Sequence, residues 1–243
     1  MLIPCDRHSA EDLAHWRKLS AIDAMRARRD QRRLDAQARE SARHMRAFLA
    51  DGPCYLGVSW GKDSVVLAHL AALNGLDVPR VHVHAPGYET PFNGLVRDAF
   101  FARFPCADYH EIACAVTADG GAEERHAAGY AVASARFGDR YISGVRADES
   151  YARTMRLYGH GISSARTCAP LSRWRGEDVF AWCALHDLPL HPSYAMTMGG
   201  RLDRAQIRVS SVGHMRGVAR GQREWEWRYY RPELLAQGLT RTP

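Results

Sequence analysis

Lysine is almost absent from this sequence: only two of its 33 basic residues, Lys18 and Lys62, are lysines, and the rest are arginines. No apolar run approaches the roughly 20 residues that a helix needs to span a bilayer, and residues 1–20 carry charges where a signal peptide has its apolar stretch. These absences predict a cytoplasmic protein with no membrane partner. The six cysteines include no Cys-x-x-Cys pair, so their spacing argues against zinc and cluster motifs and predicts scattered reduced thiols.

The overall composition is that of a globular chain. With 243 residues, 46% hydrophobic and 25% charged, the sequence can form one sizeable α/β domain with an appendage. The net charge of +6 is uneven, because residues 1–50 carry +4, residues 201–243 carry +5, and the middle of the chain carries −3. Two interpretations stay open: the basic ends bind a polyanion such as nucleic acid, or they are solvated helix faces of an arginine-rich protein.

The most informative stretch is Tyr55–Leu73. It predicts a buried strand over 55–58, a polar loop over 59–63 and an apolar helix that begins near Ser64. Such a loop points backbone N–H groups and the positive end of a helix at one place, which suits a phosphate. The spacing is not that of a Walker A loop, since three residues separate Gly57 from Gly61 and an aspartate follows the lysine.

Strands and helices are expected to alternate along the chain, which predicts an α/β fold with a doubly wound parallel sheet. The expected strands are 79–85, 107–113 and 140–143, and the expected helices are 92–104, 123–137 and 175–186. Before them, residues 10–50 predict one long helix, or two with a break, that packs across the domain or against a second subunit. Because ligands of such sheets bind at the carboxyl ends of the strands, the loops 59–64, 85–91 and 144–153 should meet in one crevice.

A second polar element follows the strand at 140–143. Gly144 is followed by Arg146, and Arg153 and Arg156 come one and two helical turns after Ser150, so three arginines could converge on an anion. Glu149 could pair with one of them and hold it in place. His82 and His84 share one face of a strand, but with no third ligand nearby they are interpreted as structural.

These elements resemble a known family. Ser59-Trp60-Gly61-Lys62-Asp63-Ser64 resembles the pyrophosphatase loop Ser-Gly-Gly-Lys-Asp-Ser (PP-loop) of the adenine nucleotide alpha hydrolases, with Trp60 in place of the second small residue. Within that superfamily, the chain is similar to the phosphoadenosine phosphosulfate (PAPS) reductase family. The further matching segments are Gly87 with Glu89-Thr90, Gly144–Ser150, Pro170–Trp174, Asp178-Val179 and Leu188–Tyr194.

The resemblance implies a Rossmann-like PP-loop nucleotide-binding domain over 51–194, with a helical segment over 1–50 before it and a basic, aromatic extension over 195–243 after it. It implies ATP and Mg²⁺ as cofactors and no iron–sulfur cluster. Lys62, Asp63 and Arg146 would bind the nucleotide and act in catalysis, with Asp63 as the metal ligand. Cys168 would carry sulfur, if Arg166 or Arg173 stabilised its thiolate. The other nucleotide-binding residues would be Ser59, Trp60, Gly61, Ser64, Gly87, Gly144, Glu149 and Arg153.

The C-terminal segment departs from the family. PAPS reductases carry a Glu-Cys-Gly-Leu-His segment there, whereas no cysteine follows Cys183 in this sequence. We therefore predict an ATP pyrophosphatase that adenylylates a substrate, for example for sulfur incorporation. The alternatives are a PAPS or adenylyl sulfate reductase with an atypical thiol, and a nucleotide-binding subunit without catalysis.

The partners expected are an adenine nucleotide, a nucleic acid or sulfur-donor protein, and a second copy in a homodimer. The C-terminal arginines and the nearby aromatics could clamp a nucleic acid or the phosphates of a substrate. Alternatively, a C-terminal helix buries the aromatics. The residues in question are Arg201, Arg204, Arg208, Arg216, Arg220, Arg223, Trp225, Trp227, Tyr229 and Tyr230.

Overall fold

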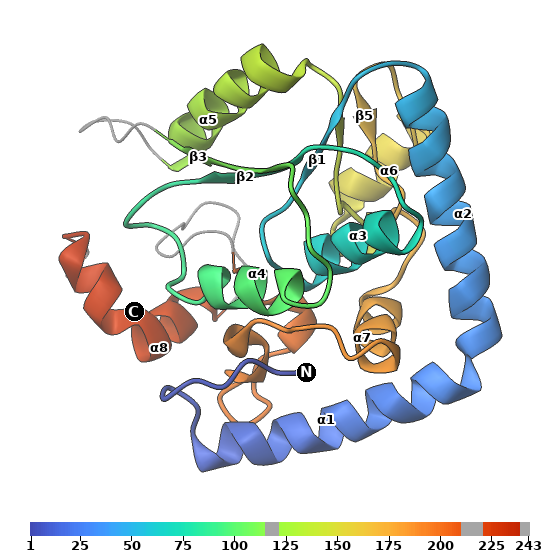
Figure 1. Ribbon diagram of the computed structural model, residues 1–243. Helices are drawn as coiled ribbons and strands as arrows, with labels where there is room; N and C mark the ends of the chain where they lie inside the picture. The colour runs from blue at the N-terminus through green and yellow to red at the C-terminus, as the bar shows by residue number, and fades with distance from the viewer. Residues whose placement is uncertain (115–121, 210–220, 239–243) are drawn as a thin grey trace.

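The sheet lies at the centre of the computed structural model, which describes residues 1–114, 122–209 and 221–238 (Figure 1). Within these residues, five parallel strands pair in the order β3-β2-β1-β4-β5. The strands are β1 (Tyr55–Gly57), β2 (Arg80–His84), β3 (Tyr109–Ala113), β4 (Tyr141–Ile142) and β5 (Thr167–Cys168). The expected doubly wound α/β fold is confirmed. Strand β5 was not expected, because a strand of two residues is too short to show a period.

Helices cover both faces of the sheet. Successive strand residues point to opposite faces, and here both faces carry apolar side chains that helices bury. Leu56 of β1 belongs to one hydrophobic cluster with Val65 of α3 (Lys62–Leu73) and Phe100 of α4 (Asn93–Phe101). Tyr55 belongs to the other cluster, together with Ala133 of α5 (Ala122–Phe137). Helices α3 and α4 therefore lie on one face, and α5 covers the opposite face.

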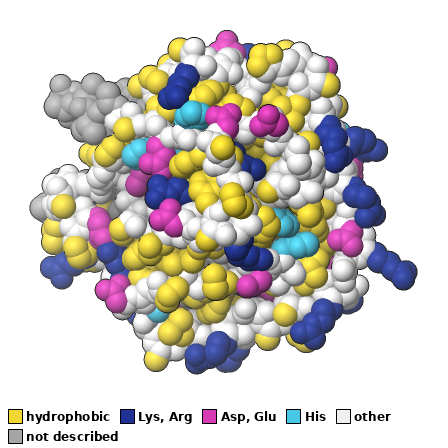
Figure 2. All heavy atoms as spheres, in the orientation of Figure 1, with side chains coloured by type: hydrophobic (Ala, Val, Ile, Leu, Met, Phe, Trp, Pro, Cys, Tyr) yellow, Lys and Arg dark blue, Asp and Glu magenta, His cyan; other side chains and the backbone are white. Residues whose placement is uncertain are grey.

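The N-terminal segment forms two helices, α1 (Ala10–Arg29) and α2 (Gln31–Ala50), which break at the non-helical backbone of Asp30. Helix α1 packs against α7 (Gly176–Leu185), and α2 packs against α3 (Figure 1). Arg26 and Arg33 pair with carboxylates of α7, while other basic side chains project into solvent along the edge formed by α2 (Figure 2). The segment therefore packs across the domain, which was one of the two packings expected.

The C-terminal segment contains two 3₁₀ turns, η2 (Pro192–Ala195) and η3 (Arg204–Gln206), and helix α8 (Gln222–Ala236). Trp225, Tyr229 and Tyr230 of α8 are buried. The Trp225 indole donates to the carbonyl of Met196 at 2.6 Å, and the Tyr229 hydroxyl donates to Asp12 at 2.7 Å. Of the two interpretations of the aromatics, the structure shows the helix that buries them. Arg216 and Arg220 lie outside the described residues.

One hydrophobic cluster joins all three predicted segments, since it includes Trp16, Val65 and Trp225. The segment around Trp174 has a structural part in this packing: the Trp174 indole donates to Ser41 of α2 at 3.0 Å, and Asp178 accepts from Arg33 at 2.7 Å. No helix in the described ranges is both long and apolar enough to cross a membrane.

Candidate functional site

The order of strands reverses between β1 and β4, which are neighbours in the sheet. At such a switch point the loops that follow the two strands diverge and leave room for a ligand. Here the loops touch: a Cβ atom on Gly144 would lie 3.1 Å from the carbonyl carbon of Asp63 and 3.3 Å from its oxygen. Only glycine allows the chain after β4 to approach the start of α3 this closely.

Replacing Gly144 with alanine is therefore expected to lower the free energy of unfolding by roughly 1–3 kcal/mol, because the added methyl group meets backbone that cannot rotate away. Gly159→Ala is the matched control. A Cβ atom there meets nothing within 4 Å, so that variant should gain roughly 0.5–1 kcal/mol from helix propensity. Urea unfolding of both variants checks the prediction, which fails if they shift in the same direction.

The loop between β1 and α3 keeps a glycine-like backbone at Trp60. Its φ of 57° lies in the left-handed region, which costs a non-glycine residue roughly 1–2 kcal/mol. The side chain offsets this cost by burial, because the indole packs against Phe100 and Phe101 and donates to the hydroxyl of Tyr109 at 3.2 Å. The Trp60 side chain thus points into the core, and only its backbone faces the loop.

The loop presents several backbone N–H groups. Helix α3 begins at Lys62, two residues before the expected start, with Gly61 as its N-cap. Ser64 Oγ closes the turn by donating to the Gly61 carbonyl at 3.0 Å and accepting from the Ser59 N–H at 3.2 Å. The Lys62 N–H donates to the Tyr194 hydroxyl at 3.0 Å. No acceptor among the described residues bonds the N–H groups of Trp60, Gly61, Asp63 and Ser64. Unpaired N–H groups at the start of a helix suit an anion, and residues 59–64 are here called the anion loop.

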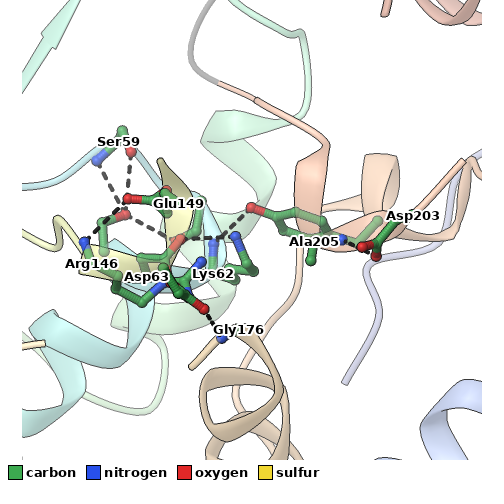
Figure 3. A network of polar contacts seen from close by, with 12 residues as sticks. Ser59, Lys62, Asp63, Arg146, Glu149, Gly176, Asp203 and Ala205 are labelled. Carbon is green, nitrogen blue, oxygen red and sulfur yellow. Dashed lines mark hydrogen bonds and ion pairs between the residues drawn. The ribbon is translucent and has the colours of Figure 1, made fainter. Parts of the chain in front are cut away.

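Asp63 is the centre of a partly buried network of charges (Figure 3). Its Oδ2 lies 2.9 Å from Lys62 Nζ, and its Oδ1 accepts from Arg146 Nε at 2.5 Å. Burial by itself would raise the pKa of Asp63, but the two cations hold that pKa below its ordinary value, so the carboxylate is ionised. Lys62 is 3% exposed and its Nζ faces the rings of Tyr194 and Phe180, so its charge acts through Asp63 and does not point out of the loop.

Arg146 links this network to two other elements. Its Nη1 lies 2.5 Å from Asp148 Oδ1, and the other oxygen of Asp148 accepts from the Gly176 N–H at the start of α7 at 2.8 Å. Glu149 accepts from the Arg146 backbone N–H at 3.1 Å and pairs with Arg153, as expected from the sequence. This holds η1 (Ala147–Glu149) and the first turn of α6 (Tyr151–His160) in place beside the loop.

Further arginines gather around Arg153. Burial lowers the pKa of Arg153, and the nearby charges of Arg208, Arg146 and Arg156 lower it further, while the Asp63 carboxylate acts against them. Arg208 follows η3, which lies against the start of α7, since a Cβ atom on Gly176 would be 3.6 Å from the Cβ of Ala205. Like charges brought together on separate segments are stabilised by an anion between them. The sequence did not single out Arg208 from the other C-terminal arginines.

The residues around Asp63 fit a magnesium ion that is bound together with phosphate, but they do not supply enough ligands to bind the ion by themselves. Both oxygens of Asp63 accept from cations, although a carboxylate keeps further lone pairs. No group of three or more His, Cys, Asp or Glu that could hold a metal ion occurs in the described parts of the chain. Mg²⁺ commonly binds through one or two carboxylates together with substrate phosphates, and Asp63 offers one such carboxylate.

A cavity of about 1050 Å³ opens beside the arginines. It runs from Ser143 and Arg146 between α5 and α6, over the rings of Tyr55 and Tyr141 on the sheet. Its volume is at the upper end of the range for small-molecule sites, about 300–1000 Å³. The sequence did not predict this cavity, because the space between α5 and α6 depends on how the two helices pack on the sheet. The wall residues include Tyr130, Ser134, Arg153, Arg156, Leu157 and His160.

The loop after β2 reaches the site through the C-terminal segment. The Thr90 hydroxyl lies 2.8 Å from His191 Nε2 and 3.2 Å from the carbonyl oxygen of Val209. Val209 in turn packs on the anion loop, since a Cβ atom on Gly61 would lie 3.1 Å from Val209 Cγ2. Gly87 is exposed at the turn, with open space around it and its carbonyl bonded to Gln237. Its predicted place in the nucleotide site has no support from these contacts.

Glu89, on the same loop, is a carboxyl group that burial keeps protonated, with its pKa raised to about 8. Asn93 donates to it, and His82 Nε2 lies 3.8 Å away. Because the native state holds this proton between about pH 4.5 and pH 8, the free energy of unfolding should fall as pH rises through that window, by roughly 1.4 kcal/mol per pH unit.

Glu89→Gln should remove this part of the pH dependence, because the amide keeps the shape of the carboxyl group and does not titrate. Urea unfolding at several pH values between about 5 and 8 measures the difference between wild type and variant. The difference should grow in favour of the variant as pH rises. Two parallel curves would contradict the protonated state of Glu89.

Cys168 lies apart from the anion loop, on β5, and its side chain is fully buried. Burial raises the pKa of its thiol, which contacts Ser163 Oγ at 3.3 Å. Arg166 and Arg173, the cations that were expected to stabilise a thiolate, are exposed and face Asp139 and Glu40. The structure therefore brings together Ser59, Gly61, Lys62, Asp63, Ser64, Gly144, Arg146, Glu149 and Arg153, and it leaves Cys168 without the surroundings of a reactive thiol.

The fold and the site define an α/β protein with a loop of unbonded backbone N–H groups at the switch point of its sheet. No family model and no curated protein sequence matches the chain. Among solved structures, it is similar to PAPS reductase from Candida auris in a phosphate complex, with a TM-score of 0.53 and 13% identity over 78% of this chain and 97% of that one. This likeness shows that the chain shares the Rossmann-like α/β fold of that reductase.

Two further structures align at lower scores. NMN synthetase from Francisella tularensis has a TM-score of 0.49 and 15% identity over 86% of this chain and 88% of that one. The U34-tRNA thiolase NcsA from Methanococcus maripaludis, with its [4Fe-4S] cluster, has a TM-score of 0.44 and 15% identity over 86% of this chain and 82% of that one.

Proposed function

We propose that the protein is an ATP pyrophosphatase that adenylylates a second substrate. An oxygen of that substrate attacks the α-phosphorus of ATP, and the bond from the α-phosphorus to the oxygen that bridges it to the β-phosphate breaks. Pyrophosphate leaves with the bonding electrons, and AMP stays on the substrate. The observation that carries this proposal is the set of unbonded N–H groups at Trp60, Gly61, Asp63 and Ser64, beside the arginines.

The charges of the site suit a departing pyrophosphate. Backbone N–H groups are fixed donors that need no reorganisation when negative charge develops on a leaving group. Arg153 and Arg208 add positive charge that can bind the β- and γ-phosphates as they leave. Lys62 and Arg146 are positioning residues: they balance Asp63 and thereby fix the loop against the segment after β4.

Mg²⁺ would be held mainly by the phosphate oxygens, with Asp63 as the carboxylate that the loop contributes. When bound, the ion would neutralise charge on the phosphates. We assign the cavity next to Arg146 to the part of the substrates that extends away from the phosphates, because its wall combines tyrosine rings and aliphatic side chains with polar groups. An adenylylated substrate is open to displacement of AMP by a nucleophile, such as the sulfur of a donor protein.

Calorimetric titration of ATP, AMP and PAPS in the presence of Mg²⁺, with an assay of pyrophosphate in the same samples, tests the proposal. We expect ATP to bind more tightly than AMP, because AMP lacks the two phosphates that the arginines hold, and we expect slow release of pyrophosphate. Preference for PAPS without pyrophosphate would overturn the proposal in favour of a reductase. Binding of ATP that never leads to pyrophosphate, with any acceptor, would leave a nucleotide-binding subunit.

A further inference from the structure

Helix α6 presents an exposed face whose side chains have no place in the core. No residue of α6 is buried. Tyr151 and Tyr158 are 79% and 82% exposed, which makes them the most exposed large hydrophobic side chains in the described part of the protein. Met155, at 49%, lies between them. Residues at spacings of four and three share one face of a helix, so the three side chains form a stripe, here called the α6 stripe.

The charge around the α6 stripe is positive. The helix contains Arg153, Arg156 and His160 and no acidic residue. Arg156 is exposed, and no carboxylate among the described residues lies within ion-pairing distance of it. Arg166, 69% exposed, lies at the rim of the same cavity and is 3.7 Å from an exposed aspartate, a separation at which an exposed pair contributes little. Exposed rings beside unpaired cations are the features that bind single-stranded nucleic acid.

We propose that the α6 stripe binds a single strand of nucleic acid, with bases stacked on Tyr151 and Tyr158 and phosphates near Arg156 and Arg166. The two tyrosines are two helical turns apart, roughly 10 Å along the axis, which is about the rise of three stacked nucleotides. Arg156, on the flank of α6 next to Met155, and Leu157 line the cavity that begins at Arg146. A nucleotide turned out of the strand would therefore lie beside the anion loop, where it could accept AMP from ATP. This role of the strand as the acceptor of AMP rests on the proposed function.

Charge argues against a second copy of this chain as the occupant. In a twofold contact the same surface faces itself, so Arg156 and Arg166 of one copy would meet those of the other. Bringing unpaired arginines together would cost free energy that three side chains of one helix do not offset. A polyanion meets the same arginines with opposite charge.

The proposal is tested by fluorescence anisotropy of short labelled RNA and DNA. Each is used in single-stranded and in duplex form, and ATP is left out. The key variant is Tyr151→Ala with Tyr158→Ala. Both side chains are exposed, so the variant should fold, which circular dichroism checks. We expect single strands to bind more tightly than duplexes, and the double alanine variant to lose at least about tenfold in affinity. Tyr151→Phe with Tyr158→Phe keeps the rings and should bind like the wild type.

Arg32→Gln, at an exposed arginine of α2, is the control for diffuse attraction to a basic protein. Loss of affinity in that variant as large as in the double alanine variant would overturn the assignment to α6. The assignment would also be overturned if the labelled strands leave the anisotropy unchanged and if light scattering shows that the wild type self-associates and the double alanine variant does not. The α6 stripe would then be a contact between copies. The RNA and DNA arms show which strand is preferred.

The acceptor role has its own readout, so the two proposals can fail separately. Adding the bound strand to an ATP assay should raise pyrophosphate release in the wild type and not in the double alanine variant. Binding of the strand with no rise in pyrophosphate would overturn the acceptor role and keep the α6 stripe as a nucleic-acid site. Absence of pyrophosphate with every acceptor would instead count against the ATP pyrophosphatase itself.

Discussion

Replacing Arg146 with methionine is expected to lower the free energy of unfolding by about 3–5 kcal/mol, because removal of one member of a buried ion network leaves its partners uncompensated. Arg146 is 2% exposed and bonds both Asp63 and Asp148 at 2.5 Å. Its loss also frees the segment after β4 from the start of α3. Pyrophosphate release should therefore fall by at least about a hundredfold, since the loop would no longer hold its donors in place.

Arg173→Met is the matched control for this variant, because it also removes an arginine but from an exposed pair with Glu40 at 3.2 Å. Its unfolding free energy should change by less than about 1 kcal/mol. Urea unfolding gives both values, and the pyrophosphate assay at a temperature where both variants are folded gives the second readout. An Arg146→Met protein as stable as the Arg173→Met protein would show that the network around Asp63 does not hold the site together.

The second large effect is expected in nucleotide affinity. Replacing both Arg153 and Arg208 with glutamine should raise the Kd for ATP at least about a hundredfold, because a hydrogen bond to a charged group contributes roughly 1.5–3 kcal/mol. The affinity for AMP should change much less, since AMP lacks the β- and γ-phosphates. Both arginines lie near the surface, Arg208 being exposed and Arg153 half-buried, so the variant should fold.

The matched control removes two arginines from α2, Arg32 and Arg39, both exposed. Calorimetric titration of ATP and AMP should show little change for this control. If ATP and AMP lose affinity equally in the Arg153 and Arg208 variant, then the two arginines do not bind the outer phosphates. Equal losses in the control would attribute the effect to the net charge of the protein.

The anion loop illustrates how far sequence reasoning extends. The strand, the loop and the helix from Tyr55 to Leu73 follow from short-range periodicity and from the small residues between them, and all three are found. The direction of each side chain in the loop does not follow. Lys62 was expected to face phosphate, and it points inward because Tyr194, 132 residues later, and Phe180 provide a cover for its charge.

The same limit applies to Cys168 and to the C-terminal arginines. A cysteine between two arginines suggests an activated thiol, but the helix α2 and strand β4 that pack around Cys168 bury it, and the arginines turn toward other partners. Among the C-terminal arginines, Arg204 is buried against Asp23, whereas Arg208 reaches the surroundings of Arg153. Nothing in the local sequence distinguishes these two, because the difference arises from the packing of η3 on α7.

By itself the sequence determined the alternation of strands and helices, the parallel sheet and the place of the anion loop, because each follows from patterns of residues close together in the chain. Only the tertiary structure decided that Arg208 joins Arg153, that Tyr194 fixes the first turn of α3, and that α5 and α6 enclose a cavity beside Arg146. These features depend on segments that meet across the switch point of the sheet, and their positions are set by the packing of the whole core.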